Sequence, residues 1–145
     1  MNSNALRAYD QVSKMTLSGP EIEAATLTKA AAKLKSCQDN WHADGRDSEL
    51  DDALKFNQRM WSVFQGELER EDNPLQKKVR GDVLRLSAFI DKRILEIMAY
   101  PNPEKLTAII SINQNIAAGL RQRPMGAVGG AGQKKGLLIE APVES

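Results

Sequence analysis

The chain has 145 residues and carries 20 basic and 19 acidic side chains, for a formal net charge of +1. Its length is typical of a single domain, and its 41% hydrophobic and 27% charged residues are ordinary for a soluble globular protein. This balance of charge lacks the basic excess that is typical of nucleic-acid-binding domains.

The sequence also favours one cellular compartment. Its single cysteine, Cys37, cannot form an intramolecular disulfide, which is typical of a reducing cytoplasm. No apolar run approaches the roughly 18 residues of a membrane span, and the first residues, MNSNALRAYDQVSKM, are too polar for a signal-peptide core. We therefore expect a cytoplasmic protein that does not insert into a membrane.

The first predicted element is an amphipathic helix within residues 1–19, where Leu6, Tyr9 and Val12 form a weak apolar stripe. It ends at Ser18-Gly19-Pro20, a turn signal whose proline suits the first turn of the next helix. That helix is expected to end around the sequence HADGRD. Its apolar positions follow helical spacing: Leu27, Ala30, Ala31, Leu34 and Trp41.

The next predicted helix begins at Ser48, which with Asp51 forms a capping box. Asn73 is expected to cap the helix after it, with Pro74 at the first helical position. Between these two starts, apolar and amide side chains recur in alternating steps of four and three residues, as in a heptad seam. The seam consists of Leu50, Leu54, Asn57, Trp61, Phe64 and Leu68.

The helix expected after Pro74 has the widest apolar stripe of the chain, and this width predicts a central position in the fold. The stripe contains Val79, Val83, Leu86, Ile90, Ile94 and Ile97, with Leu84, Phe89, Leu95 and Met98 on its flanks. Pro101 ends this helix and Pro103 begins the last one. The last helix places Leu106, Ile109, Ile110, Asn113, Ile116 and Leu120 at helical spacing.

Residues 121–145 hold five of the ten glycines and two of the six prolines, and they predict a disordered tail. The tail is either inert or carries a short docking motif in the sequence GLLIEAP. The predicted fold is therefore all-α. It is a small antiparallel bundle of four main helices over residues 20–120, preceded by the amphipathic helix of residues 1–19.

Side chains that carry chemistry are scarce. His42 is the only histidine, and with Cys37 it cannot supply the four ligands of a zinc site. The glycine-rich sequence GAVGGAG at 126–132 follows no predicted strand, so it lacks the context of a phosphate-binding loop. We therefore expect no enzymatic activity, no metal and no cofactor.

A basic cluster at the start of the helix expected after Pro74 suggests an alternative, direct binding of RNA. Acidic residues surround this cluster, and no aromatic side chain interleaves with it for base stacking. We therefore favour the interpretation that the cluster is a solvated helix face, and we do not expect nucleic acid as a partner. The cluster consists of Lys77, Lys78, Arg80 and Arg85.

Three segments together resemble one known family. They are NQRMWSVFQGELEREDNPL (57–75), VRGDVLRLSAFIDKRILEIM (79–98) and IISINQNIAAGL (109–120). In this order and at this spacing they resemble the flagellar biosynthesis protein FlaF of alphaproteobacteria, best over residues 48–120. One departure is that Lys77 and Lys78 stand where family members carry acidic residues.

The resemblance implies a small helical protein of the cytoplasm without enzymatic activity. The family acts on flagellin as a secretion chaperone and positive regulator of flagellin synthesis, opposite the repressor FlbT. It also implies flagellin, through its terminal helices, as the main partner, with FlbT and the flagellar export apparatus as further ones. The alternative is a post-transcriptional regulator that acts on flagellin mRNA directly or as an adaptor for FlbT.

A partner helix would lie in an apolar groove, and we expect its lining among the stripes of the last three helices. Helical spacing favours burial for the aromatic members of the seam, which are expected to pack against the stripe of the following helix. In the absence of flagellin, the stripe of residues 6–12 is expected to occupy the groove. The candidate partner-binding residues are Trp61, Phe64, Leu68, Leu86, Phe89, Ile90, Ile109, Ile112 and Ile116.

Overall fold

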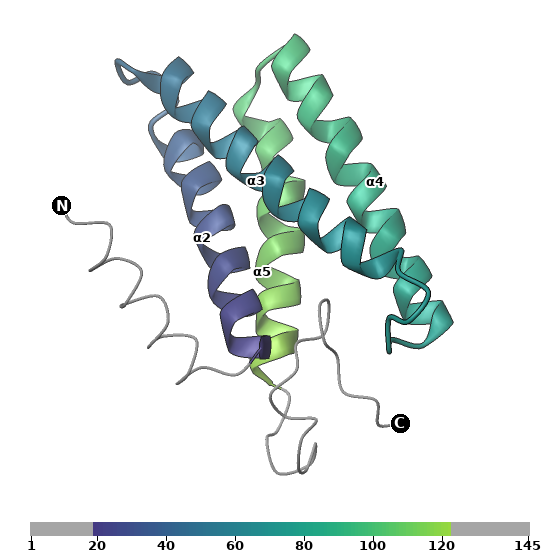
Figure 1. The fold of residues 1–145 in the computed structure, drawn as a ribbon. Helices are drawn as coiled ribbons and strands as arrows, with labels where there is room; N and C mark the ends of the chain where they lie inside the picture. The colour runs from purple at the N-terminus through teal and green to yellow at the C-terminus, as the bar shows by residue number, and fades with distance from the viewer. Residues whose placement is uncertain (1–18, 123–145) are drawn as a thin grey trace, which may run out of the picture.

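A computed structural model describes residues 19–122 of the chain, and in this range the protein is an all-α bundle (Figure 1). Successive helices run in opposite directions along the bundle, which confirms the predicted antiparallel arrangement. The predicted helix of residues 1–18 and the predicted tail from residue 123 lie outside the described residues. The elements are α2 (Gly19–Asp39), α3 (Arg46–Leu68), α4 (Lys77–Ala99), the 3-10 helix η1 (Pro103–Leu106) and α5 (Thr107–Arg121).

The most extensive packing in the bundle joins α2 to α5, which lie side by side (Figure 1). The buried side of α2 includes Ala24, Ala30 and Ala31, and α5 contributes Ala117. Small side chains let two helix backbones approach closely. The two helices therefore form the centre of the bundle.

Helix α4 packs mainly on α3, and its contact with α5 is small. The prediction that this helix is central is therefore wrong. Five side chains along one side of α4 are buried. Part of its wide stripe reaches the surface, because no third helix of residues 19–122 covers it: Leu86 of the stripe and Phe89, Leu95 and Met98 on its flanks are exposed.

The predicted start of α3 at Ser48 is wrong, because the helix already begins at Arg46. Gly45 precedes it with φ of +84°, a conformation that glycine adopts without steric cost. The carbonyl of Gly45 accepts the N–H of Glu49 at 3.0 Å, which starts the helix upstream of Ser48. Trp41 likewise lies outside the helix, in the turn after α2, with the Arg46 guanidinium 4.0 Å from its ring.

Helix α4 begins at Lys77, three residues after the predicted start at Pro74. Asn73 does not cap it. Instead, the Asn73 amide donates to the carbonyl of Glu67 at 2.8 Å and accepts the N–H of Leu75 at 3.0 Å. Asn73 therefore closes the end of α3 and shapes the connection.

Pro103 begins the next helical segment, as predicted, although its first turn is the 3-10 helix η1. Asn102 caps this turn by accepting the N–H of Glu104 at 2.8 Å. The helix then continues as α5 from Thr107. No helix of residues 19–122 is long and apolar enough to cross a membrane.

A buried chain of polar side chains joins the three helices of the core. The indole N–H of Trp61 donates to the Asn113 side-chain oxygen at 3.0 Å, and the Asn113 amide donates to the Asn57 oxygen at 2.7 Å. The Asn57 amide donates in turn to the carbonyls of Ala30, at 3.2 Å, and Ala53, at 2.9 Å. Burial of these amides is tolerable because each has partners.

Candidate functional site

Five of the nine candidate residues lie inside the bundle, each at most 4% exposed. The aromatic pair among them packs edge to face, with ring centroids 5.5 Å apart and planes at 87°. In the folded chain these side chains offer almost no surface to a partner, apart from Phe64, which lines a groove between α2 and α3. They are Trp61, Phe64, Leu68, Ile90 and Ile109.

The remaining four candidates reach the surface between α4 and α5. Leu86 and Phe89 on α4 are 36% and 37% exposed, and Ile112 and Ile116 on α5 are half-buried. We call these four residues the α4–α5 face. The structure thus divides the predicted set into a buried part and an exposed part.

Two contacts fix the orientation of this face. The Arg93 guanidinium lies 5.0 Å from the Phe89 ring and donates to the Lys105 carbonyl at 3.1 Å, so this flank of α4 points toward η1 and α5. On α5, Thr107 receives a hydrogen bond from Gln38 of α2. Ile116 is nine residues, or two and a half turns, further on, and therefore lies on the side away from α2.

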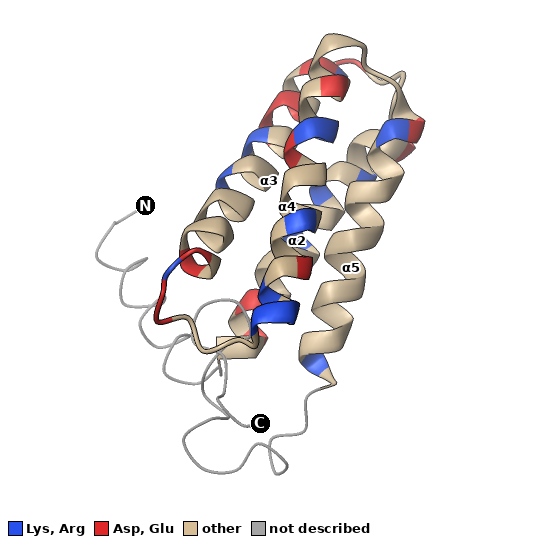
Figure 2. Cartoon of the chain, turned by 90° about the vertical axis from the view of Figure 1, so that its right-hand side faces the viewer, with Lys and Arg blue, Asp and Glu red and all other residues tan. Residues whose placement is uncertain are grey.

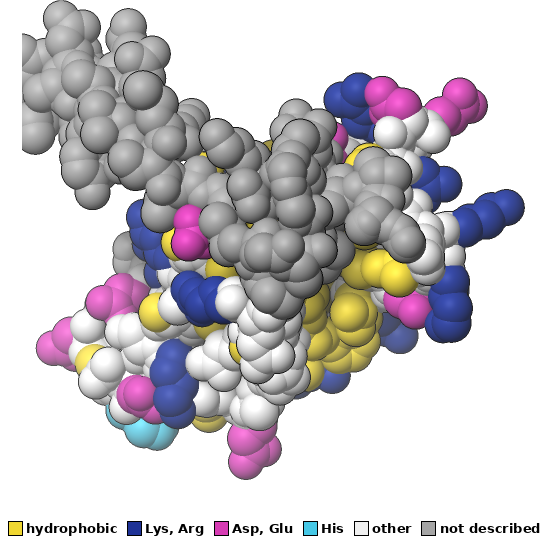
Figure 3. Space-filling view, turned by 90° about the horizontal axis from the view of Figure 1, so that it is seen from below, with side chains coloured by type: hydrophobic (Ala, Val, Ile, Leu, Met, Phe, Trp, Pro, Cys, Tyr) yellow, Lys and Arg dark blue, Asp and Glu magenta, His cyan; other side chains and the backbone are white. Residues whose placement is uncertain are grey.

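Helix α5 presents an almost uncharged surface, because Arg121 is its only charged residue (Figure 2). The exposed positions of α5 before Arg121 carry hydroxyl, amide or small side chains. Viewed from below, the molecule also shows hydrophobic side chains gathered at the end of the bundle where α4 begins and α5 ends (Figure 3). Depletion of charge is typical of the centre of a protein interface.

Exposed apolar side chains also occur away from this face. Leu95 is 63% exposed and lies nine residues after Leu86, on the opposite side of α4. Val63 and Tyr100 are 58% and 77% exposed. Leu95 therefore provides an apolar position on the same helix that is separate from the α4–α5 face.

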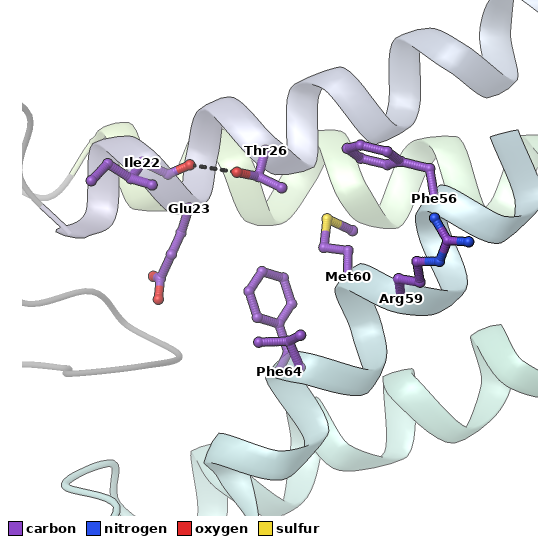
Figure 4. A pocket seen from close by; sticks show the side chains of 8 residues that line it. Ile22, Glu23, Thr26, Phe56, Arg59, Met60 and Phe64 are labelled. Atoms are coloured by element: carbon purple, nitrogen blue, oxygen red, sulfur yellow. Dashed lines mark hydrogen bonds between the residues drawn. The ribbon is translucent and has the colours of Figure 1, made fainter. Parts of the chain in front are cut away.

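A second apolar surface is a groove of about 420 Å³ between α2 and α3 (Figure 4). Phe64 and Met60 form its buried part, and Val63 and Phe56 lie nearer to solvent. The Thr26 hydroxyl donates to the carbonyl of Ile22 at 2.9 Å, so its hydrogen-bonding need is met within α2. We call this the α2–α3 groove. It is lined by Ile22, Glu23, Thr26, Phe56, Arg59, Met60, Val63 and Phe64.

Basic side chains stand at the edges of the α2–α3 groove. The ammonium groups of Lys29 and Lys33 lie 5.4 and 5.3 Å from the centre of the Phe56 ring, and Arg59 on α3 is exposed. Lys33 also pairs with Asp52 at 2.9 Å. This hydrogen bond and the charges of Lys33, Arg59 and Lys29 lower the pKa of the Asp52 carboxyl. The groove therefore has a largely apolar lining that includes one buried acidic residue, Glu23, and it is mostly basic at its rim.

The α2–α3 groove was not predicted from the sequence. Ile22 and Thr26 fall outside the apolar stripe of α2, and Phe56, Met60 and Val63 fall outside the heptad seam of α3. A signal was nevertheless present. Phe56, Met60 and Val63 flank the seam along one side, so the apolar surface of α3 is wider than the seam alone.

The basic cluster is engaged largely within the fold. Asp82 pairs with Lys78 and with Arg85, and Arg80 donates to the carbonyl of Arg70 at 3.0 Å. The Lys78 hydrogen bond is the main cause that lowers the pKa of Asp82. His42 lies exposed in the turn after α2. Within the described part of the chain, no group of three or more metal-ligating side chains is close enough to hold an ion.

Comparison with known proteins gave one match. The family model described as "Flagellar protein FlaF" matches residues 5–120, which is well over half of the chain. Neither the curated proteins nor the solved structures include a match. The family match covers all four described helices up to Leu120 and includes most of the segment that precedes them. The chain therefore belongs to the FlaF family of flagellar proteins.

Proposed function

We propose that this protein is a cytoplasmic, non-enzymatic chaperone that binds flagellin before export and promotes flagellin synthesis. Membership of the FlaF family supports a flagellar role. The observation that carries the finer proposal is the α4–α5 face, where two helices expose apolar side chains next to an uncharged helix surface.

A flagellin terminal helix is the proposed occupant of this face. Flagellin termini are amphipathic helices that pack together only in the assembled filament, so their apolar stripes need cover before export. An amphipathic helix binds a hydrophobic groove through side chains one turn apart. Ile112 and Ile116 on α5 are one turn apart, and Leu86 and Phe89 lie on the facing flank of α4.

The proposed binding is also compatible with release. A disordered segment that folds on binding loses conformational entropy, which keeps its affinity moderate for the area that it buries. Such a complex can protect flagellin in the cytoplasm and release it at the export apparatus.

The test is co-purification of the full chain with full-length flagellin and with flagellins truncated at either end. Substitution of Ile116→Glu places a charge in the face and is expected to abolish retention of flagellin. The matched control is Leu95→Glu, which makes the same kind of change on the opposite side of α4. Circular dichroism would show that both variants keep their helices.

The outcomes separate the competing functions. Retention that is lost in Ile116→Glu and kept in Leu95→Glu supports the proposal. If the wild-type chain retains no form of flagellin, the chaperone function is contradicted. If it instead retains flagellin mRNA, with affinity that falls steeply as salt is raised, the RNA-binding function is favoured. A complex with FlbT that is stable without flagellin would favour an adaptor.

A further inference from the structure

We propose that residues 5–17 form a helix that folds back antiparallel to α2 and fills the α2–α3 groove as a fixed fifth helix of the bundle. This inference does not depend on the proposed function. It differs from the expectation that the same segment occupies the partner groove, because it leaves the α4–α5 face free.

The position of the groove along the chain is the first argument. The described structure begins at Gly19, and Ile22, the first residue of the groove, is less than one turn further along α2. A segment that leaves Gly19 therefore meets the groove at once. The FlaF family match begins at residue 5, so this segment belongs to the sequence pattern of the family together with the bundle.

The turn is the second argument. Ser18 precedes α2, and Gly19 and Pro20 are the first two residues of that helix; together the three form a turn signal. Two helices joined by a short connection are usually antiparallel neighbours. The opposite side of α2 is occupied by α5, its most extensive packing partner. The free apolar side of α2 is the one that carries Ile22 and Thr26.

The lengths agree as well. A helix from Leu6 to Leu17 spans eleven steps, or about 16 Å at 1.5 Å per residue. The stretch of α2 from Ile22 to Lys33, which runs from one end of the groove to the cations over Phe56, is also eleven steps long. The helix can therefore follow the groove over its length, and its apolar stripe of Leu6, Tyr9 and Val12 covers six of the eleven steps, or about 9 Å.

One pair of opposite charges supports a particular register, although the segment also carries the basic residues Arg7 and Lys14. Asp10 is the only acidic residue among residues 1–18. It lies eight residues before Ser18, and Lys29 lies ten residues after Gly19, so an antiparallel hairpin brings the two within one turn of each other. Arg59 stands on the other edge of the groove. The Asp10 carboxylate would thus lie near Lys29 on one edge of the groove or near Arg59 on the other.

Cross-linking of the full chain tests the placement. Val12 lies six residues before Ser18 and Thr26 seven residues after Gly19, so Val12→Cys and Thr26→Cys are expected to form a disulfide within one chain on mild oxidation. The matched control pairs Val12→Cys with Ile116→Cys on the α4–α5 face. Cys37 is 2% exposed and stays in both proteins, and Val12→Cys alone measures its background reaction.

Three outcomes would overturn the proposal. Cross-linking of Val12→Cys to Ile116→Cys would place the segment on the α4–α5 face. A disulfide-linked dimer would show that a second copy fills the groove. The absence of any cross-link would show that the segment does not dock at all.

A charge reversal tests the register independently. Asp10→Lys is expected to slow the Val12–Thr26 cross-link severalfold, because it places a cation at the basic rim. Adding Lys29→Asp is expected to restore the rate. Lys29 is exposed, so neither change disturbs the core. Equal rates in all three proteins would contradict the register. Flagellin retention is expected to be unchanged throughout, which separates this test from that of the proposed function.

Discussion

Asn57 and Asn113 are fully buried, and each amide depends on the other helices for its hydrogen bonds. Hydrogen bonds contribute modestly to stability when they form, but an unsatisfied buried group costs about 1–3 kcal/mol. Trp61, on the same stretch of α3, joins this network because its indole N–H donates to the Asn113 side-chain oxygen. A polar network at the centre of the bundle therefore specifies how α2, α3 and α5 align.

We expect Asn57→Ala to lower the free energy of unfolding by about 1–3 kcal/mol, because it leaves the Asn113 amide buried without its acceptor. The measurement is urea unfolding followed by circular dichroism. Asn115→Ala, an exposed change on α5, is the control and should leave the midpoint nearly unchanged. Equal effects of the two substitutions would show that the network contributes nothing specific.

The thiol of Cys37 gives a second prediction for a single residue. Burial raises the pKa of this thiol, and the Glu49 carboxylate raises it further. The thiolate is the reactive form, so the folded protein should react slowly with thiol reagents at neutral pH and rapidly once unfolded in urea. A fast reaction in the absence of urea would show that the α2–α3 interface near Cys37 opens readily.

One glycine directly before helix α3 and one within it give opposite predictions for substitution by alanine. Gly45 precedes the helix with φ of +84°, whereas Gly66 lies inside the helix, and an added Cβ meets no atom within 4 Å at either position. Gly45→Ala should therefore lower the free energy of unfolding by about 1–2 kcal/mol through backbone strain alone. Gly66→Ala should raise it by about 0.5–1 kcal/mol through helix propensity.

Thermal unfolding of the two variants beside the wild type measures both effects. Because both changes add one methyl group in open space, each variant is the control of the other. A loss of stability in Gly66→Ala would contradict the assignment of this residue to the last turn of α3.

The helices themselves were predictable from the sequence, and their ends only in part. The seam from Leu50 to Leu68 is buried along its length, as its spacing indicated. The start of α3 was misplaced because Ser48 fits a capping box, while Gly45 can begin the helix earlier. Asn73 was misassigned because an asparagine near a helix end can serve either the helix before it or the one after it.

Which stripe is buried by which neighbour could not be predicted. The apolar stripe of α4 is the widest in the chain, yet α2, with several alanines, lies at the centre. Stripe width reports how much apolar surface a helix carries, and it does not report how much of it the fold covers. Leu86 and Phe89 became part of a candidate site for this reason, whereas Ile90 on the same stripe became core.

At the scale of the whole molecule, the bundle consists of a tight pair, α2 and α5, to which α3 and then α4 are added (Figure 1). Helix α4 is joined to α3 by the Gln65 amide, which donates to Ser87 and, at 2.9 Å, to Asp91. Its contact with α5 is small. A partner that lies across the α4–α5 face would therefore add contacts to α4 and α5, where those between the two helices are few.

Native-state hydrogen exchange should reveal this difference in packing between α4 and the α2–α5 pair. Local opening requires less free energy where fewer contacts are lost, so the amides of α4 should exchange faster than those of α2 and α5. Bound flagellin should slow exchange in α4 and α5 more than in α2, because it would bridge the α4–α5 face. The Ile116→Glu variant with flagellin is the control and should show the exchange of the free protein. Protection of α4 equal to that of α2 in the free protein would contradict this description of the bundle.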